Sequence, residues 1–300
     1  MIYKNIKKKT HKTNIYSSFN SVILIMQIVN QLQELNEALA TESNMSIGFV
    51  PTMGFLHHGH LSLINASKKK ADFTIVSIFV NPTQFNNPSD LENYPVSLKE
   101  DLMTLEQEEV DLVFCPDYNT LYTNEKPVEI SLGKLDSVLE ATKRKGHFQG
   151  VIRVVNIFFK LINPNYAFFG EKDYQQYLII AELARVCFPE IEIIMCPTQR
   201  EQIGLAMSSR NSRLSSKDFK KAKEIYRILK YCKENFDFSN RKELEKKCLK
   251  KLAEFSEPEY FEIRHSDDLL NNGDKLKRWR AFTATNLGGI RLIDNIALNQ

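Results

Sequence analysis

The 300-residue sequence predicts an α/β fold in which a parallel-sheet domain precedes a smaller α+β domain. Two observations carry this prediction. Short apolar runs rich in β-branched and aromatic residues alternate with segments of helical spacing up to about residue 198. Beyond that point the chain becomes rich in lysine and glutamate, with helical periodicity over 217–256. A chain of 300 residues with 43% hydrophobic content suits two such domains.

The predicted sheet begins with two strands joined by a helix. Residues 46–50 (SIGFV) and 73–80 (FTIVSIFV) have the continuous apolar character of buried parallel strands. Between them, 59–71 carries apolar residues at helical spacing. The same reasoning predicts helices over 97–109, 148–162 and 173–188, and strands over 110–116, 165–170, 191–197, 259–266 and 290–296.

Residues 26–40 are predicted to form an amphipathic helix. Its apolar face would contain Ile28, Leu32, Leu35 and Leu39. Residues 1–25 are expected to be a disordered extension without a role in the core, or sequence upstream of a start at Met26. The predicted domains are therefore 26–198, which would be catalytic, and 199–300.

Charge and cysteine content narrow the class of protein. A formal net charge of +3, spread along the chain, predicts no dedicated nucleic-acid or membrane partner. The early apolar run, 21–29, is too short to span a bilayer. The five cysteines are widely spaced and form no CxxC motif, which predicts free, mostly buried thiols in a reducing, cytoplasmic compartment.

Four polar clusters follow predicted strands or open the second domain. They are PTMGFLHHGH (51–60), NPTQF (81–85), GEKDYQQ (170–176) and GLAMSSRN (204–211). Ligands of open parallel sheets bind at the carboxyl ends of the strands, so we expect these clusters to form one site. Neither a GxxxxGK[ST] nor a GxGxxG motif is present, so a nucleotide would need a different cradle.

The HHGH turn is a candidate phosphate cradle. Gly59 permits close approach of the backbone, and the helix that follows offers free N–H groups and the positive end of its dipole. His57 and His60 can both face the phosphate and stabilise charge that develops during attack on it. A zinc site is the main alternative for clustered imidazoles, although no cysteine or acidic ligand lies nearby in sequence. His58 occupies a variable slot, and we expect it to face solvent.

The other clusters add charges suited to a nucleotide. Lys172 is a point charge for phosphate, and Asp173 is suited to a ribose hydroxyl. Arg210, in MSSR, has a planar guanidinium that can donate two hydrogen bonds at once, which is suited to departing pyrophosphate. Gln84 and Gln176 either bind a small polar substrate or only cap their loops, and the residues alone do not decide between these roles.

Six blocks together resemble the pantoate–β-alanine ligase family, whose members belong to the nucleotidylyltransferase superfamily with HIGH-type motifs. The blocks are PTMGFLHHGH, SIFVNPTQF, GHFQGV, FFGEKDYQQ, GLAMSSRN and RLIDN, in order over residues 26–300. The resemblance implies a Rossmann-like catalytic domain, a homodimer, and magnesium as a cofactor with ATP. It also implies that pantoate attacks the α-phosphate of ATP to form pantoyl adenylate, which β-alanine then converts to pantothenate and AMP.

By this resemblance, His60 is the proton donor, His57 its partner, and Lys172 and Arg210 are further catalytic residues. Gln84 and Gln176 would hold pantoate, with Gln84 also near β-alanine. Asn81, Arg144 and His147 lie in matching motifs without assigned roles. The implied ATP contacts are Met53, Gly54, Phe55, Leu56, His57, His58, Gly59, His60, Gly170, Glu171, Lys172, Asp173, Gln199, Met207, Ser208, Ser209 and Arg210.

Four positions either depart from the pattern of this family or match it only loosely. Glu100 and Asp101 align with an acidic segment near the metal, so the metal ligands themselves remain unknown. Gln199 replaces a small apolar residue beside the adenine, which changes little if the backbone makes that contact. Arg153 stands where Thr or Ser is usual near the pantoate wall, and would alter substrate affinity if it points inward.

Three competing functions remain open at this point. The first is a nucleotidylyltransferase whose final product is the nucleotide adduct. The second is a nucleic-acid-binding protein such as a class I synthetase fragment, which the low net charge disfavours. The third is an inactive homologue, which the intact set of charged site residues disfavours.

Overall fold

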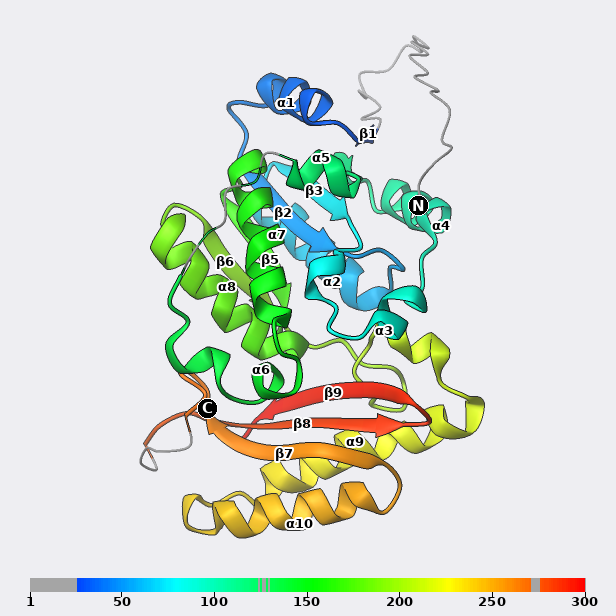
Figure 1. The fold of residues 1–300 in the computed structure, drawn as a ribbon, viewed down its shortest axis with the longest axis vertical. Coiled ribbons are helices and arrows are strands. Elements are labelled where there is room, and N and C mark those ends of the chain that lie inside the picture. Colours follow the sequence, from blue (N-terminus) through cyan, green and yellow to red (C-terminus); the bar gives the residue numbers. More distant parts are fainter. Residues whose placement is uncertain (1–25, 124, 126–127, 129, 271–275, 300) are drawn as a thin grey trace.

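The computed structural model describes residues 26–123, 125, 128, 130–270 and 276–299. Their main feature is a six-stranded, fully parallel sheet with the order β1-β4-β3-β2-β5-β6 (Figure 1). A three-stranded antiparallel sheet, β7-β8-β9, lies at the other end of the molecule. The strands of the parallel sheet are Gln27–Val29, Ile47–Thr52, Phe73–Ile78, Leu112–Phe114, Tyr166–Gly170 and Glu192–Cys196, numbered β1 to β6.

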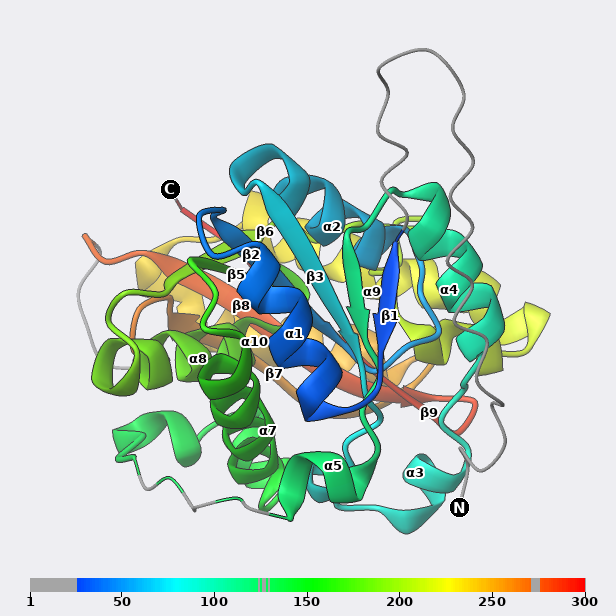
Figure 2. The same ribbon diagram turned by 90° about the horizontal axis from the view of Figure 1, so that it is seen from above.

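Successive strand residues face opposite sides of the parallel sheet, and both sides are covered. Phe49 and Phe169 point into the cluster formed with α1, α7 and α8, whereas Val50 and Phe168 point into the cluster formed with α2 and α4. Figure 2 shows these two helical layers on either side of the sheet. The helices are α1 Leu32–Thr41, α2 His58–Lys70, α4 Leu98–Gln107, α7 His147–Ile162 and α8 Tyr174–Cys187.

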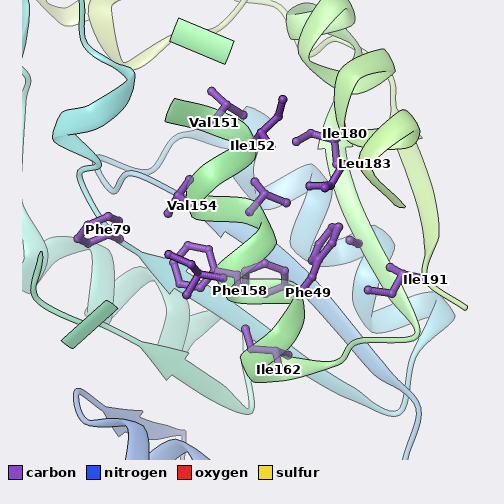
Figure 3. Packing of buried hydrophobic residues seen from close by; sticks show 14 of the residues in the cluster. Phe49, Phe79, Val151, Ile152, Val154, Phe158, Ile162, Ile180, Leu183 and Ile191 are labelled. Atoms are coloured by element: carbon purple, nitrogen blue, oxygen red, sulfur yellow. The ribbon is translucent and has the colours of Figure 1, made fainter. Parts of the chain in front are cut away.

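Helix α7 is the centre of the larger cluster. Its Phe158 packs against Phe49 of β2 with ring centroids 5.5 Å apart, and Ile180 and Leu183 of α8 close the same cluster (Figure 3). Most of the α7 sequence, HFQGVIRVVNIFFKLI, is buried, which explains why this helix is apolar nearly all round.

The antiparallel sheet has one face covered by helices and one face against the parallel-sheet unit. Trp279 packs with α9 and α10, while Tyr260 and Phe282 pack with Leu139 and Tyr174 of the preceding unit. The bounds are α9 Ser216–Glu234, α10 Arg241–Ala253, β7 Glu257–His265, β8 Trp279–Leu287 and β9 Ile290–Ala297. The short helices α3 Pro88–Glu92, α5 Tyr118–Tyr122 and α6 Glu140–Lys143 lie in the connections.

The predicted α/β class and parallel sheet are confirmed, with two differences. Residues 27–29 form edge strand β1, so the helix starts only at Leu32; Ile28 is 46% exposed and does not share a helical face with Leu35. Strand β8 (WRAFTATNL) was not predicted, because it mixes apolar, charged and small polar residues that are all largely buried. Residues 1–25 lie outside the described part, and the domain limits 26–198 and 199–300 remain predictions.

Within the described residues, all five cysteines are free, with Cys187 exposed and Cys196, Cys232 and Cys248 buried. None of the described helices has the length and apolar character needed to cross a bilayer.

The order of the strands indicates where a ligand binds. Strand β2 lies between β3 and β5, so the connections run outward in opposite directions from the β2–β5 boundary. Such a switch point opens a crevice at the carboxyl ends of the strands. The HHGH turn follows β2 and the GEKD segment follows β5, which places these two clusters on either side of the crevice.

Candidate active site

A cavity of about 230 Å³ lies at the carboxyl ends of the central strands. All four polar clusters contribute to its wall, so segments between Pro51 and Arg210 that are far apart in the chain meet there. The predicted site residues that line it are Met53, His57, Gly59, His60, Gln84, Gly170, Lys172, Asp173, Gln176, Gln199, Met207, Ser208, Ser209 and Arg210.

The other predicted ATP contacts do not line this cavity: Gly54, Phe55, Leu56, His58 and Glu171. His58 is exposed, as expected from its variable slot. The backbone N–H groups of Phe55 and Leu56 donate to the Asp101 carboxylate at 2.8 and 2.7 Å, so this part of the turn is braced from behind.

The acidic pair in the first turn of α4, Glu100 and Asp101, is engaged in contacts with the protein itself. Asp101 is only 3% exposed, and burial raises its pKa despite the two backbone N–H groups that it accepts. The Glu100 carboxylate accepts a hydrogen bond from Ser97 at the start of the helix. Among the described residues, no group of three or more His, Cys, Asp or Glu side chains could hold a metal ion. The match of this pair to a metal segment therefore stays a prediction, and the contacts of Asp101 show that it holds the backbone of Phe55 and Leu56, just before the HHGH turn.

Two of the three histidines of the HHGH turn, His57 and His60, take part in the cap of helix α2, each through its Nδ1 atom. His57 Nδ1 accepts the Gly59 N–H at 3.1 Å, and His60 Nδ1 accepts the His57 N–H at 3.3 Å. A backbone N–H can only donate, so each Nδ1 is unprotonated and each neutral ring carries its proton on Nε2. The rings lie 4.1 Å apart between centroids. The cap thus leaves both Nε2–H groups as donors for a ligand.

Gly59 is required by this cap. A Cβ at position 59 would lie 2.7 Å from Cε1 and 2.8 Å from Nδ1 of His57, closer than real Cβ contacts. The sequence predicts that the glycine admits a phosphate to the backbone. In the structure, the absence of a side chain at Gly59 makes room for the His57 ring, which lies against the first turn of α2.

Both imidazoles are neutral at physiological pH. Burial, together with the Lys172 charge, lowers the pKa of His57 to about 4. Burial, the neighbouring His57 and the Lys172 charge lower the pKa of His60 well below its usual value. These rings therefore act as neutral hydrogen-bond donors rather than as cations.

We expect long-range ¹H–¹⁵N NMR spectra to show His57 and His60 as Nε2–H tautomers at pH 6, with the His57 midpoint near 4. The unfolded chain takes up these protons near pH 6.5 and the folded chain does not, so their contribution to stability is complete above pH 6.5 and declines as the pH falls towards 4. A midpoint near 6.5 for either ring, or a proton on Nδ1, would contradict this assignment.

Cations face the histidines from two later segments. The Lys172 Nζ lies 3.5 Å from Asp173 Oδ2 in the short 3₁₀ turn after β5. The Arg210 guanidinium donates to both oxygens of Asp90, at 3.2 and 2.7 Å. Burial opposes ionisation of Asp90, but its bonds to the Arg210 and Arg213 guanidinium groups outweigh this and lower its pKa.

The serines of MSSR have structural contacts. Ser209 Oγ donates to the Phe55 carbonyl at 3.2 Å, which ties this segment to the HHGH turn. Ser208 Oγ accepts the Arg210 N–H at 3.3 Å and begins the 3₁₀ turn there. The Ser209 bond brings the fourth cluster, GLAMSSRN, against the first, PTMGFLHHGH.

Gln84 is held by three neighbours. Asn81 Nδ2 donates to Gln84 Oε1 at 2.9 Å, and Gln84 Nε2 donates to Met53 Sδ at 3.2 Å, which leaves the second N–H of the Gln84 amide for a ligand. The Gln84 carbonyl lies 2.8 Å from His147 Nδ1. A Cβ at Gly150 would lie 2.3 Å from the Thr83 carbonyl oxygen, so the GHFQGV block is shaped to support this loop.

Gln175 and Gln176 are adjacent in the chain, but their side chains have different surroundings. Gln176 lines the cavity, whereas Gln175 is buried and binds the backbone of 135–140. Gln199 also lines the cavity, and its carbonyl accepts the Met207 N–H at 2.9 Å. Arg153 does not line the cavity: it pairs with Glu125 and stacks on the Tyr122 ring at 4.2 Å. The possibility that Arg153 points inward is therefore wrong.

The sequence did not reveal several residues of the wall. Tyr94 lines the cavity, and Arg210 lies over its ring at 5.4 Å. Val151, Val154 and Phe158 of α7 form an apolar side. Nothing in the apolar pattern of α7 separates these side chains from those of the core, although GHFQGV could have marked the start of this helix as part of the site.

A second cavity of about 380 Å³ shares Arg144, Lys172 and Arg210 with the first. Its wall adds further cations, Arg213 and Arg291 among them. Six basic side chains and three carboxylates line this second cavity, so its wall has an excess of positive charge, which suits a polyanion.

The zinc alternative is not supported by this geometry. Both histidine Nδ1 atoms are occupied by backbone N–H groups, and no acidic or thiol side chain completes a metal-binding group with them in the described part of the chain. The site combines neutral donors, cations and a primary amide.

Comparison with known proteins gives one consistent family. Residues 25–297 match the family model described as Pantoate-beta-alanine ligase. A pantothenate synthetase from Christiangramia forsetii is 45% identical, over 92% of this chain and all of that protein, and one from Leptospira interrogans is 45% identical, over 84% and 90%.

Solved structures agree. The pantothenate synthetase of Thermus thermophilus superposes with a TM-score of 0.84 at 36% identity, covering 92% of this chain and 100% of that one. A pantoate-beta-alanine ligase from Francisella tularensis, complexed with Beta-gamma ATP and beta-alanine, has a TM-score of 0.77 at 38% identity, covering 92% and 98%. The chain belongs to the pantoate-beta-alanine ligase family.

Proposed function

We propose that this chain joins pantoate to β-alanine in two steps, with ATP as the source of energy. In the first, a pantoate carboxylate oxygen attacks the α-phosphorus and the bond to the β-phosphate oxygen breaks, releasing pyrophosphate. In the second, the β-alanine amine attacks the acyl carbon of pantoyl adenylate, and the bond to AMP breaks. The observation that carries this proposal is the meeting of neutral imidazole donors, two cations and an oriented amide in one cavity.

His57 and His60 would act at the α-phosphate. Their Nε2–H groups are fixed before any ligand arrives, because the helix cap sets both rings. Preorganised donors stabilise charge that builds up in the transition state without reorganising. Because the pKa of His57 is lowered to about 4 and that of His60 well below its usual value, neither ring would need to lose a proton to reach this state.

Lys172 and Arg210 would receive the β- and γ-phosphates. They lie on different segments, and both also line the second cavity, which offers the leaving pyrophosphate a cationic path. Asp90 now occupies the Arg210 fork, so the triphosphate would have to share or displace that carboxylate.

We propose that magnesium enters with ATP, held mainly by the phosphate oxygens. Mg²⁺ commonly binds through substrate phosphates, water and one or two carboxylates. The Glu100–Asp101 pair is committed to other contacts, so no residue of that pair is assigned to the ion. Pantoate would lie between Gln84 and Gln176, both of which line the cavity. We also propose a cytoplasmic location, which the free thiols support, and a homodimer, which only the resemblance to the family supports.

Gln84→Ala is expected to raise the KM for pantoate about tenfold or more and to leave the KM for ATP within about twofold. The substitution removes an amide donor aimed at an anionic substrate, and such a bond contributes about 1.5–3 kcal/mol. Steady-state kinetics with each substrate varied in turn measures both constants. Gln149→Ala, an exposed position on α7, is the control. A selective loss of ATP affinity would show that Gln84 faces the nucleotide instead.

The activity itself is tested by omitting each substrate. AMP should form only when ATP, pantoate and β-alanine are all present in multiple-turnover conditions, whereas one equivalent of pyrophosphate should appear with ATP and pantoate alone. AMP formation that ignores β-alanine, or a stable nucleotide adduct as final product, would favour a nucleotidylyltransferase.

A further inference from the structure

The RLIDN block, residues 291–295, contributes Arg291 to the wall of the second cavity, but its Asp294 and Asn295 have no role in the steps above. It forms the centre of strand β9 in the C-terminal sheet, and its side chains alternate between the two faces. Arg291 and Asn295 lie on the face turned towards the parallel-sheet unit. Leu292 packs into the cluster with α9 and α10 on the other face.

Both the nitrogen and the oxygen of the Asn295 side-chain amide are hydrogen-bonded, and the nitrogen binds the segment that carries Lys172. Its Nδ2 donates to the carbonyl oxygens of Glu171 and Lys172 at 3.0 and 2.9 Å, and its Oδ1 accepts from Arg280. The side chain is buried, at 3% exposure for the residue. The donor from Arg280 identifies the oxygen, so the orientation of the amide is defined by its partners.

The side chain of Glu171 also holds the 3₁₀ turn Glu171–Asp173 in place. Arg280 Nη2 donates to Glu171 Oε1 at 2.9 Å, and the Thr198 N–H donates to Glu171 Oε2 at 3.2 Å. These contacts explain why Glu171 does not line the cavity although its neighbours do. A 3₁₀ turn of three residues has little stability of its own, so its position depends on such contacts.

Arg291 and Asp294 of the block bind residues that lie next to two other basic segments of the cavity wall. Arg291 donates to both oxygens of Glu140, at 2.7 and 2.8 Å, and Glu140 in turn lies 3.8 Å from the cavity residue Arg144. Asp294 accepts two bonds from Arg200, at 2.6 and 3.0 Å, in the segment that leads to MSSR. One strand therefore contacts the supports of three parts of the cavity wall.

We propose that Asn295 is a positioning residue for ATP: by binding the backbone of Glu171 and Lys172, it fixes the Lys172 ammonium where the triphosphate must lie. The C-terminal sheet thus supports Lys172, although none of its described residues lines the first cavity. The inference rests on the proposed function of the cavity, and in particular on the role given to Lys172.

Asn295→Asp tests this with a side chain of the same shape. The carboxylate still accepts from Arg280 but cannot donate to the two carbonyls, and it places an oxygen against them. Asn299→Asp is the matched control, because Asn299 also binds backbone of the C-terminal sheet, donating to the Lys277 carbonyl at 3.0 Å and accepting from Trp279, with no contact to the turn. Binding of ATP and of adenosine is measured by calorimetry without pantoate, and ligand-free unfolding by thermal melting.

Asn295→Asp is expected to weaken ATP binding at least tenfold and adenosine binding by less than twofold, with a melting temperature like that of Asn299→Asp. Unchanged ATP affinity, or an equal loss for ATP and adenosine, would overturn the inference. If Asn295→Asp does not fold, Asn295→Ser, which also loses the paired donors but adds no charge, is judged by the same two affinities. Failure of the wild-type protein to bind ATP would instead refute the proposed function.

Discussion

His60→Ala is expected to lower the rate of pantoate-dependent pyrophosphate release by about 10² to 10³-fold at saturating ATP. The variant loses a preorganised Nε2–H donor at the position proposed for the α-phosphate. It also removes the acceptor of the His57 N–H, so the first turn of α2 loses half of its reciprocal cap. Rapid-mix measurements of pyrophosphate in a single turnover report this step directly.

His58→Ala is the control for this substitution. It lies in the same turn and on the same helix, but it is exposed and does not line the cavity. Its rate should remain within about twofold of the wild type. Pyrophosphate release by His60→Ala at a near-normal rate would rule out the role assigned to His60, provided that the variant melts cooperatively.

Lys172→Met is expected to reduce kcat/KM for ATP by about 10² to 10³-fold, because it removes a mostly buried cation that is proposed to bind the phosphates. The aliphatic stem is kept, so packing changes little. Lys160→Met, which removes an exposed charge at the end of α7, should have almost no effect.

This variant carries a second signature that does not depend on turnover. The Lys172 charge contributes to lowering the pKa of both His57 and His60, so Lys172→Met should raise the His57 midpoint above about 4 in an NMR titration. An unchanged midpoint together with normal ATP kinetics would place the ammonium away from the cavity that the imidazoles line.

The location of the site could be predicted because it depends on features that the sequence carries directly. Continuous apolar runs mark buried parallel strands, and polar clusters after them mark the edge where ligands bind. That reasoning brought His60, Gln84, Lys172 and Arg210 together, and one cavity contains all four.

The sequence could not show which hydrogen-bond or ion-pair partner each polar side chain has in the folded protein. Asp101 looks like a metal ligand in sequence, but its carboxylate accepts two backbone N–H groups across more than 40 residues of chain. Arg153 looks like part of the substrate wall, but its partner is Glu125. Such pairings depend on the direction in which a side chain leaves its helix, which residue type and spacing do not specify.

The apolar part of the site was equally hidden. Val151 and Phe158 line the cavity, yet they belong to a helix that is buried on most sides, so no polar residue separates the cavity face from the core. Strand β8 escaped prediction for a related reason, since its buried threonines and arginine interrupt the apolar alternation.

The most direct test of the account follows the oxygen atoms of pantoate. The protein is incubated with ATP, β-alanine and pantoate labelled with ¹⁸O in its carboxylate, and the products are examined by ³¹P NMR. Attack of the carboxylate on the α-phosphate predicts one ¹⁸O in the phosphate of AMP and none in pyrophosphate. Label in pyrophosphate or inorganic phosphate, or AMP without label, would contradict adenylation of the carboxylate in this cavity.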